Sequence, residues 1–254
     1  MVNINRNSAL DTLQGLVEQS FSQNLQNMPQ EFNEQQQMAF DLFKQRIFFE
    51  EVIEESISFN RNLEWKNDNE NVKIISTAEE LVDVYKLRSI VYEDIGYSKE
   101  FPDPIDGLNF DLYDKNSAII YYKQNKVITG TCRLIFDSSK KLPVENVYSF
   151  DKFRENYNLL AELSRLVILK EKEGLGLEYK NMTAAIYNIY KYNDIDLIIS
   201  GMKKDHYKWY QKFGGFNIEY EVEDYGTLSN PSFVTSWDPS QISKHFKRIF
   251  LNIR

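Results

Sequence analysis

The feature that most constrains the fold is the alternation of strand-like and helix-like segments from residue 72 onward. Short apolar runs such as "SAIIYY" and "DIDLIIS" alternate with longer segments in which apolar residues recur every three or four positions, as in "TAEELVDVYKLRSIVYEDIG". The first pattern predicts buried strands and the second predicts amphipathic helices. We therefore predict an α/β (α+β) fold in which a mixed, largely antiparallel central sheet is flanked by helices.

Particular elements follow from local signals. We predict a short strand at "VKII", and a helix opened by a capping box in which Thr77 and Glu80 bond each other's backbone N–H. A hairpin joins "SAIIYY" to "KVITGTCRLIF" through "KQNK". Further on we expect a helix over 178–192, a buried strand "DIDLIIS" closed by Gly201, and a helix over 203–213. In "FNIEYEVEDY" apolar and polar residues alternate, which predicts a half-buried antiparallel strand that pairs with "SFVTSW".

The chain divides into three parts. Residues 1–65 show helical spacing in two stripes, one from Leu10 to Phe21 and one from Phe40 onward, separated at Met28–Pro29. They predict an N-terminal extension built as a helical hairpin, which the polar stretch "KNDNEN" links to a core over 72–237. Residues 238–254 predict a basic amphipathic helix.

Composition excludes several classes of protein. A chain of 254 residues with 42% hydrophobic and 27% charged residues is an ordinary globular protein. We expect no transmembrane segment, because no apolar run approaches the roughly 20 residues of a membrane span. A net charge of −8 argues against nucleic-acid binding, and the single cysteine, Cys132, excludes an intramolecular disulfide. A reducing cytoplasm is the expected location.

Charged residues stand inside the predicted core, where burial is costly unless each charge is paired. Arg133 and Arg165 fall in the middle of predicted strands, and Arg88 falls on an otherwise apolar helix. Acidic residues that can pair with them are Glu162, Asp106, Asp111 and Asp114. These residues predict an ion cluster that ties the loop 98–116 to the sheet, either as a purely structural device or as part of a site.

Three motifs in this order resemble a known family: "LRSIVYEDIGY", "DGLNFDLYDKNSAII" leading to "GTCRLI", and "AELSRLVI". They are similar to the autoinducer-synthase-like members of the GNAT superfamily, which include acyl-homoserine-lactone synthases and long-chain N-acyl amino acid synthases. The resemblance covers residues 74–237. The matching positions that we expect to form a substrate-binding or structural ion cluster are Arg88, Tyr97, Asp111, Asp114, Arg133, Ser164 and Arg165. Tyr92 and Glu162 also match the family motifs.

The resemblance implies an N-acyltransferase that moves an acyl group from a thioester to an amine. An ammonium must lose a proton before it attacks, and Glu162 is the candidate base. Because strict alternation would place Glu162 and Arg165 on opposite faces, we predict a β-bulge within 162–166 that brings them together and frees an N–H for the oxyanion. Tyr210 matches the tyrosine that protonates the leaving thiolate, with aromatic packing as its alternative role.

A glycine turn follows the strand, in "EKEGLG". GNAT proteins that use coenzyme A bind pyrophosphate here, and Gly174 and Gly176 are the candidate donor-binding residues. Two carboxylates, Glu171 and Glu173, are unfavourable beside a pyrophosphate. These glutamates depart from the pattern of the proteins that use coenzyme A. They favour as donor an acyl carrier protein, whose pantetheine arm brings a single phosphate, over acetyl-coenzyme A.

An acyl carrier protein is acidic, so it needs a basic surface on which to dock. The candidate docking residues lie on the helix 203–213 and in the tail: Lys203, Lys204, Lys208, Lys212, Lys244, Lys247 and Arg248. Simple solvation is the alternative reading of such lysines. Two distant histidines, His206 and His245, give no metal-ligand spacing with Cys132.

The sequence thus predicts a cytoplasmic N-acyltransferase that carries a long-chain acyl group from acyl carrier protein or acyl-CoA to a small-molecule amine such as an amino acid, without a tightly bound cofactor. A conventional acetyl-CoA-dependent GNAT acetyltransferase and a non-catalytic scaffold that binds a lipid or a protein are the alternatives. The amine acceptor, the acyl length, the choice of donor, the role of residues 1–65 and the oligomeric state stay open.

Overall fold

One mixed sheet organises the chain in the computed structural model, which describes residues 9, 13, 30–67, 69–169, 175–224 and 230–252. Its seven strands, in the order β1-β2-β3-β4-β5-β7-β6, are antiparallel to their neighbours except where β4 pairs with β5. The strands are β1 (Val72–Ile74), β2 (Ser117–Gln124), β3 (Val127–Phe136), β4 (Leu160–Ile168), β5 (Leu197–Lys203), β6 (Phe216–Val222) and β7 (Ser232–Trp237). The predicted fold class is confirmed.

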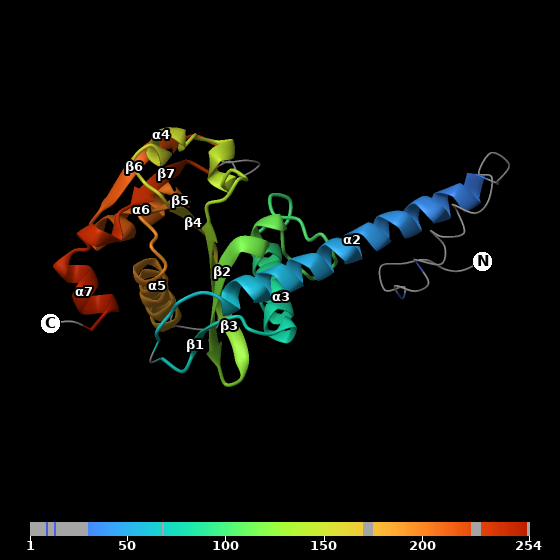
Figure 1. Cartoon of the computed structure of the whole chain (residues 1–254), viewed down its shortest axis with the longest axis horizontal. Coiled ribbons are helices and arrows are strands. Elements are labelled where there is room, and N and C mark those ends of the chain that lie inside the picture. The colour runs from blue at the N-terminus through green and yellow to red at the C-terminus, as the bar shows by residue number, and fades with distance from the viewer. Residues whose placement is uncertain are drawn as a thin grey trace.

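Helices cover both faces of this sheet (Figure 1). They are α2 (Gln30–Arg61), α3 (Ala78–Asp94), α4 (Asp151–Arg154), α5 (Leu175–Tyr192), α6 (Lys204–Tyr210) and α7 (Lys244–Phe250), with 3₁₀ helices η2 (Leu112–Asn116), η3 (Pro143–Asn146), η4 (Gln211–Phe213) and η5 (Pro239–Gln241). On the α3 face, Ile119 and Tyr121 of β2 pack against Val84. On the α5 face, Ile120 packs with Ile186. Successive side chains of β2 point to opposite faces of the sheet, so this strand contributes to the hydrophobic core on each face.

The hairpin between β2 and β3 and the start of α3 follow from turn and cap chemistry. Asn125 and Lys126 both take positive φ, 50° and 69°. A two-residue hairpin turn requires this conformation. Thr77 caps α3 by accepting a hydrogen bond from the Glu80 N–H, as predicted. The other half of the predicted capping box is wrong, because the Glu80 carboxylate accepts from the N–H of Ser76 instead.

β4 and β5 pair over three residues only and then separate. The pairing joins Leu160–Glu162 to Leu197–Ile199, after which β4 continues beside β3 and β5 continues beside β7. The prediction that Gly201 ends this strand is wrong, because Gly201 pairs with Val234 and the antiparallel ladder runs on to Lys203. A gap between two neighbouring strands thus opens at the centre of the sheet, directly after Glu162.

The last elements depart in part from the sequence pattern. β6 pairs with β7 as predicted, but Ile218 and Tyr220 are exposed, because β6 is an edge strand with a register shift between them. The tail begins as η5, and α7 starts only at Lys244, where Ser243 caps it. Phe246 and Phe250 of α7 are buried, whereas Ile249 is exposed.

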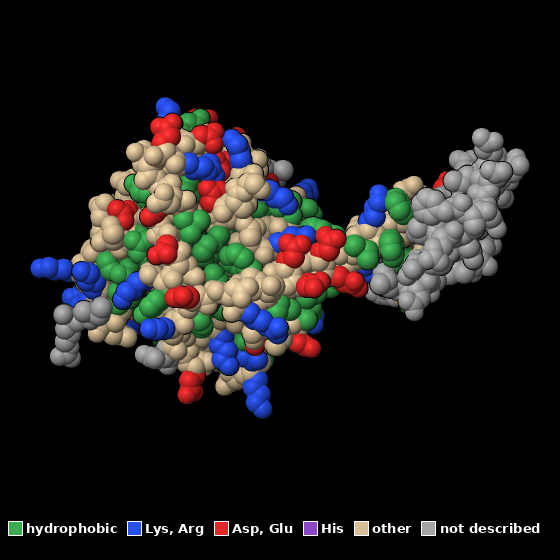
Figure 2. All heavy atoms as spheres, in the orientation of Figure 1, with side chains coloured by type: hydrophobic (Ala, Val, Ile, Leu, Met, Phe, Trp, Pro, Cys, Tyr) green, Lys and Arg blue, Asp and Glu red, His purple; other side chains and the backbone are tan. Residues whose placement is uncertain are grey.

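The described part of the N-terminal extension is the long helix α2 and the short segment that follows it. α2 reaches well beyond the sheet at its N-terminal half (Figures 1 and 2). Its last turns carry two buried polar residues: Ser56 donates to the Asp114 carbonyl at 2.6 Å, and Asn60 bonds the Ser117 carbonyl and the Ile119 N–H. The first predicted helix and the Met28–Pro29 break lie outside the described residues. None of the described helices combines the length and apolar character of a membrane span.

Candidate active site

Three arginines and two aspartates form the predicted ion cluster on the α3 face of the sheet. Asp114 is fully buried and accepts from Arg88 at 2.9 Å and from Arg133 at 3.2 Å. Asp111 accepts from Arg133 at 2.6 Å and from Arg165 at 2.9 Å. Asp111 is the N-cap of η2 and Asp114 is the third residue of this helix, where its carboxylate accepts a hydrogen bond from the Asp111 N–H. A capping box therefore holds both carboxylates in place for the arginines.

The opposite charges in the ion cluster stabilise each other's ionised forms. Burial alone would raise the pKa of Asp111, but the charges and hydrogen bonds of Arg133 and Arg165 hold that pKa well below its usual range. Burial would likewise lower the pKa of Arg133, and the two aspartates keep it raised. Ser164 accepts a hydrogen bond from Nε of Arg133. Asp111 can therefore stay ionised inside the protein.

The predicted β-bulge in β4 is confirmed. Thr131 of β3 pairs with Val167 and Arg133 pairs with Ser164, so one residue of β3 faces two of β4. Arg165 sits at this bulge in the left-handed region, with φ of 53°. The extra residue turns the Arg165 side chain to the α3 face, where it reaches Asp111. The bulge thus places Arg165 on the same face of the sheet as Glu162. The hydrogen-bond partner of Arg165 on this face is Asp111.

Glu162 lies next to this cluster, at the point where β4 and β5 separate. Its side chain is 3% exposed, and its Oε2 accepts a hydrogen bond of 2.9 Å from the N–H of Val144. Burial raises the pKa of Glu162 to about 7, against the opposing effects of the Val144 N–H and Arg133, and Asp111 and Glu145 add to the rise. A carboxyl with this pKa can take up and release a proton near neutrality.

The segment that supplies the Val144 N–H escaped the sequence analysis. Arg154 binds Asp137 through Nε at 2.7 Å and Glu145 through Nη2 at 2.6 Å. Glu145 in turn accepts from the N–H groups of Leu142 and Phe150. Arg154 thereby fastens η3 to the end of β3. The proline of "LPVEN" at the start of a helical turn, with a glutamate two residues later, was the available signal.

Loosening this support should move the ionisation of Glu162. In Arg154→Met, η3 loses its tie to Asp137 and the Val144 N–H no longer holds the Glu162 carboxylate. Since that hydrogen bond lowers the pKa of Glu162, we expect the pKa to rise further above 7. Carbon-13 NMR titration of the glutamate carboxyl carbons, with the Glu162 signal assigned by its loss in Glu162→Gln, measures the shift.

The matched control is Lys141→Met. Lys141 pairs with Asp151 in the same segment, but both side chains are largely exposed. Exposed ion pairs of this kind contribute little to the stability of the folded state. We expect the pKa of Glu162 to stay unchanged in this control; an equal shift in both variants would mean that Arg154 has no particular part in placing Val144.

The second predicted catalytic residue, Tyr210, lies on the other face of the sheet. Its ring packs against Phe213 at 5.4 Å and Phe216 at 5.5 Å between centroids, within the core that α5 and α7 cover. Burial raises its pKa. The structure therefore puts Tyr210 and Glu162 on opposite faces of the sheet.

The candidate docking and donor-binding residues are distributed over several elements. Lys208 and Lys212 are exposed on α6 and η4, and Lys244, Lys247 and Arg248 are exposed on α7. Figure 2 shows basic side chains at the end of the molecule where α7 lies.

Two of the lysines expected on the helix 203–213 have other surroundings. Lys203 is the last residue of β5, and its Nζ lies 4.9 Å from the centroid of the Tyr97 ring. Lys204 pairs with Glu221. Gly176 lies in the first turn of α5 with open space around it, whereas Gly174, Glu171 and Glu173 fall outside the described residues.

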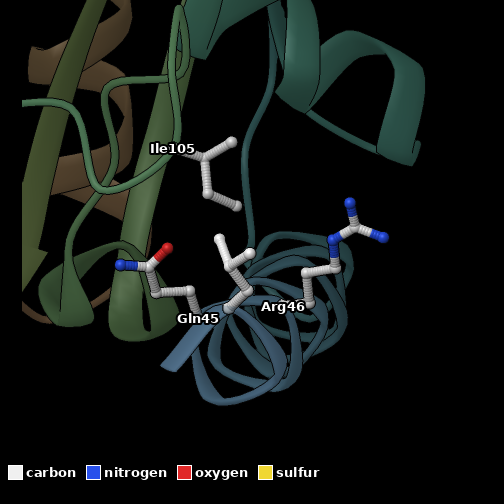
Figure 3. A pocket seen from close by; sticks show the side chains of 4 residues that line it. Gln45, Arg46 and Ile105 are labelled. Atoms are coloured by element: carbon white, nitrogen blue, oxygen red, sulfur yellow. The ribbon is translucent and has the colours of Figure 1, made fainter. Parts of the chain in front are cut away.

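A small hollow that no residue of the ion cluster lines lies between α2 and the loop that carries Ile105 (Figure 3). Leu42, Gln45 and Arg46 of α2 form its other wall. Its volume of about 10 Å³ is that of a single water molecule. The hollow is too small for an acyl chain or an amino acid.

The family follows from a comparison with known sequences. A family model described as N-acyl amino acid synthase FeeM matches residues 83–238, which is more than half of the chain and includes both η2 and the β4 motif. The chain belongs to the FeeM N-acyl amino acid synthase family. It is an acyltransferase of the N-acyl amino acid synthase type. No curated protein matches the sequence.

Solved structures share the FeeM-type fold at low sequence identity. FeeM itself, an N-acyl amino acid synthase from uncultured soil microbes, is 16% identical with a TM-score of 0.53, and the match covers 71% of this chain and 94% of that one. The acyl-homoserine-lactone synthase LasI gives the same four values. BjaI, a CoA-dependent acyl-homoserine-lactone synthase solved with MTA, is 15% identical with a TM-score of 0.53, covering 69% of this chain and 82% of that one.

Proposed function

We propose that the protein transfers a long-chain acyl group from the thioester of an acyl carrier protein to the amine of an amino acid. The observation that supports this best is Glu162: a buried carboxyl with a pKa near 7, placed where β4 and β5 separate. The gap passes from one face of the sheet to the other. A thioester held in it can face Glu162 on one side and Tyr210 on the other.

Each proton and bond in the proposed reaction has a place. Ionised Glu162 takes a proton from the acceptor ammonium, directly or through a water, and the free amine attacks the thioester carbonyl. Backbone N–H groups at the bulge stabilise the oxyanion. The intermediate then expels the thiolate as the amide bond forms, and Tyr210 supplies the proton that the sulfur takes up. The nitrogen loses its second proton in this step, and that proton returns through water to the Tyr210 phenolate.

The test uses the purified protein with each class of donor. It is incubated with long-chain acyl carrier protein and a mixture of the twenty common amino acids, and mass spectrometry is used to find an N-acyl amino acid. Parallel reactions with acyl-CoA and acetyl-CoA identify the donor. Product from acetyl-CoA alone would support the conventional acetyltransferase, and the absence of product from every donor would favour a binding scaffold.

Docking of the carrier protein is proposed for the exposed lysines of α6 and η4. An acidic carrier is attracted to Lys208 and Lys212, and the attraction weakens with salt. The double variant Lys208→Glu, Lys212→Glu should raise KM for acyl carrier protein on the order of tenfold at low salt. KM for a short acyl-pantetheine donor, which lacks the carrier, should not change.

Lys73→Glu is the control for this experiment, since Lys73 is exposed on β1 at the far edge of the sheet. An equal rise of KM in the control would indicate a general effect of net charge rather than a docking surface. A rise of KM for acyl-pantetheine in the double variant would place the two lysines at the acyl-binding site instead.

A further inference from the structure

The gap between β4 and β5 borders a cluster of aromatic rings on the α3 face. Tyr92, Tyr97 and Phe101 form this cluster, with ring centroids 5.0 Å apart for Tyr92 and Phe101 and 6.4 Å apart for Tyr97 and Phe101. Tyr92 lies in the last turn of α3 and the other two belong to the following loop. The rings form an apolar wall beside the strands that separate.

Two cations reach this wall, one from each strand. The Arg165 guanidinium of β4 lies 4.3 Å from the Phe101 centroid, and Nζ of Lys203 on β5 lies 4.9 Å from the Tyr97 centroid. Arg165 stands three residues beyond Glu162, and Lys203 stands four beyond Ile199, the last pair of the β4–β5 ladder. The two positive charges therefore flank the gap.

Two hydrogen-bond donors at the wall are buried without a partner among the described residues. Arg165 donates to Asp111 through Nη2 and also interacts with Tyr92, whereas its Nη1 has no hydrogen-bond partner of good geometry among the described residues. The Tyr97 hydroxyl is also buried and unbonded within the described part of the chain. An unsatisfied buried donor is costly, so most native structures provide it with a partner. Both donors can bind an acceptor oxygen that enters the gap.

The charge balance favours an anion there. The ion cluster contains three arginines and two aspartates, an excess of one positive charge that ionised Glu162 can cancel. Lys203 adds another positive charge and makes no salt bridge with any described carboxylate. His206, near Lys203 in the chain, has its pKa lowered by burial and by that lysine. The positive charges of Arg165 and Lys203 at the aromatic wall therefore favour a negatively charged group on a ligand.

We propose that Lys203, Nη1 of Arg165 and the Tyr97 hydroxyl bind the carboxylate of the amine acceptor. The inference rests on the proposed function for the presence of an acceptor, and it names the group by which the acceptor is selected. The bulge places Arg165 and Glu162 on the same face of β4, so a carboxylate bound by Arg165 can leave the amine of the same acceptor directed toward Glu162. Amines without a carboxylate are then poor acceptors.

The test compares amino acids with their methyl esters, which keep the amine and lose the negative charge. In the wild type, kcat/KM for the acid should exceed that for the ester roughly tenfold or more, as the loss of a charge-assisted hydrogen bond predicts. In Lys203→Met the value for the acid should fall to near that for the ester. Lys203→Arg should recover most of the preference.

Lys191→Met is the matched control, because Lys191 also lies over a tyrosine ring, Tyr192, but on α5. It should keep the full preference for the acid. Binding of the free amino acids, followed by ligand-observed NMR without any acyl donor, gives a readout that does not depend on turnover.

The two proposals fail in different ways. Equal kcat/KM values for acid and ester in the wild type would overturn the carboxylate site and leave acyl transfer intact. Carboxylate binding that Lys203→Met abolishes, in a protein that forms no N-acyl product, would overturn the proposed function and support the site. Binding that Lys203→Met leaves unchanged would exclude Lys203.

Discussion

Replacing Glu162 with glutamine is expected to lower kcat for acyl transfer by about 10²- to 10⁴-fold, the usual contribution of a general base. Glutamine keeps the size of the side chain, and its carbonyl oxygen can still accept from the Val144 N–H. What it loses is the ability to take a proton from the acceptor amine. Mass-spectrometric initial rates with acyl carrier protein measure the effect.

The pH dependence of the wild type provides a second readout. Since Glu162 acts as a base only when ionised, activity should rise with pH through about 7, the pKa of Glu162. The control variant Glu155→Gln, at an exposed position, should keep both the rate and the profile. A Glu162→Gln enzyme with full activity would exclude this residue as the base.

Stability separates a catalytic role of Glu162 from a structural one. Its pKa in the folded state lies above its ordinary value, so the folded state binds the proton more tightly than the unfolded chain. The stabilisation that this proton gives is complete below about pH 4.5 and is lost as the pH rises through about 7. At pH 8, therefore, Glu162→Gln should unfold at the same Tm as the wild type or above it. A marked fall in Tm would instead favour a structural role.

The largest loss of stability is expected for Asp114→Asn. Asp114 is fully buried and bonds both Arg88 and Arg133, so asparagine leaves these two buried guanidinium groups short of one negative charge. Breaking a buried pair in this way costs about 3–5 kcal/mol of unfolding free energy. Urea denaturation followed by circular dichroism measures it.

The control for Asp114 is Asp83→Asn on α3. Asp83 pairs with Lys86, but both side chains are more than half exposed. For such a surface substitution we expect the unfolding free energy to change by less than about 0.5 kcal/mol. If Asp114→Asn also fell within that range, the ion cluster would contribute nothing to folding. Joint replacement of Arg88 and Asp114 by apolar residues should cost less than the single change, because it leaves one buried charge fewer without a partner.

Local patterns predicted the β2–β3 hairpin because alternating apolar residues and turn signals lie close together in the sequence. The ion cluster joins distant segments, and it was predicted because a buried charge needs a partner, which left few carboxylates for Arg133 and Arg165. The bulge at Arg165 followed from requiring two charges on one face.

The errors arise where distant segments decide the outcome. Gly201 stays in β5 because β7, more than thirty residues later, continues to pair with it. The Val144 N–H reaches Glu162 through an arginine network that no spacing in the sequence reveals. Lys203 ends a strand instead of opening a helix face, and this position brings its ammonium to the ring of Tyr97.

Two polar anchors hold the last turns of α2 to the core. Ser56 and Asn60 bond three main-chain groups at η2 and the start of β2: the carbonyls of Asp114 and Ser117 and the N–H of Ile119. A protein truncated at the polar stretch after α2 would lose these three hydrogen bonds. The last turns of α2 are therefore bonded to the backbone that carries Asp114 of the ion cluster.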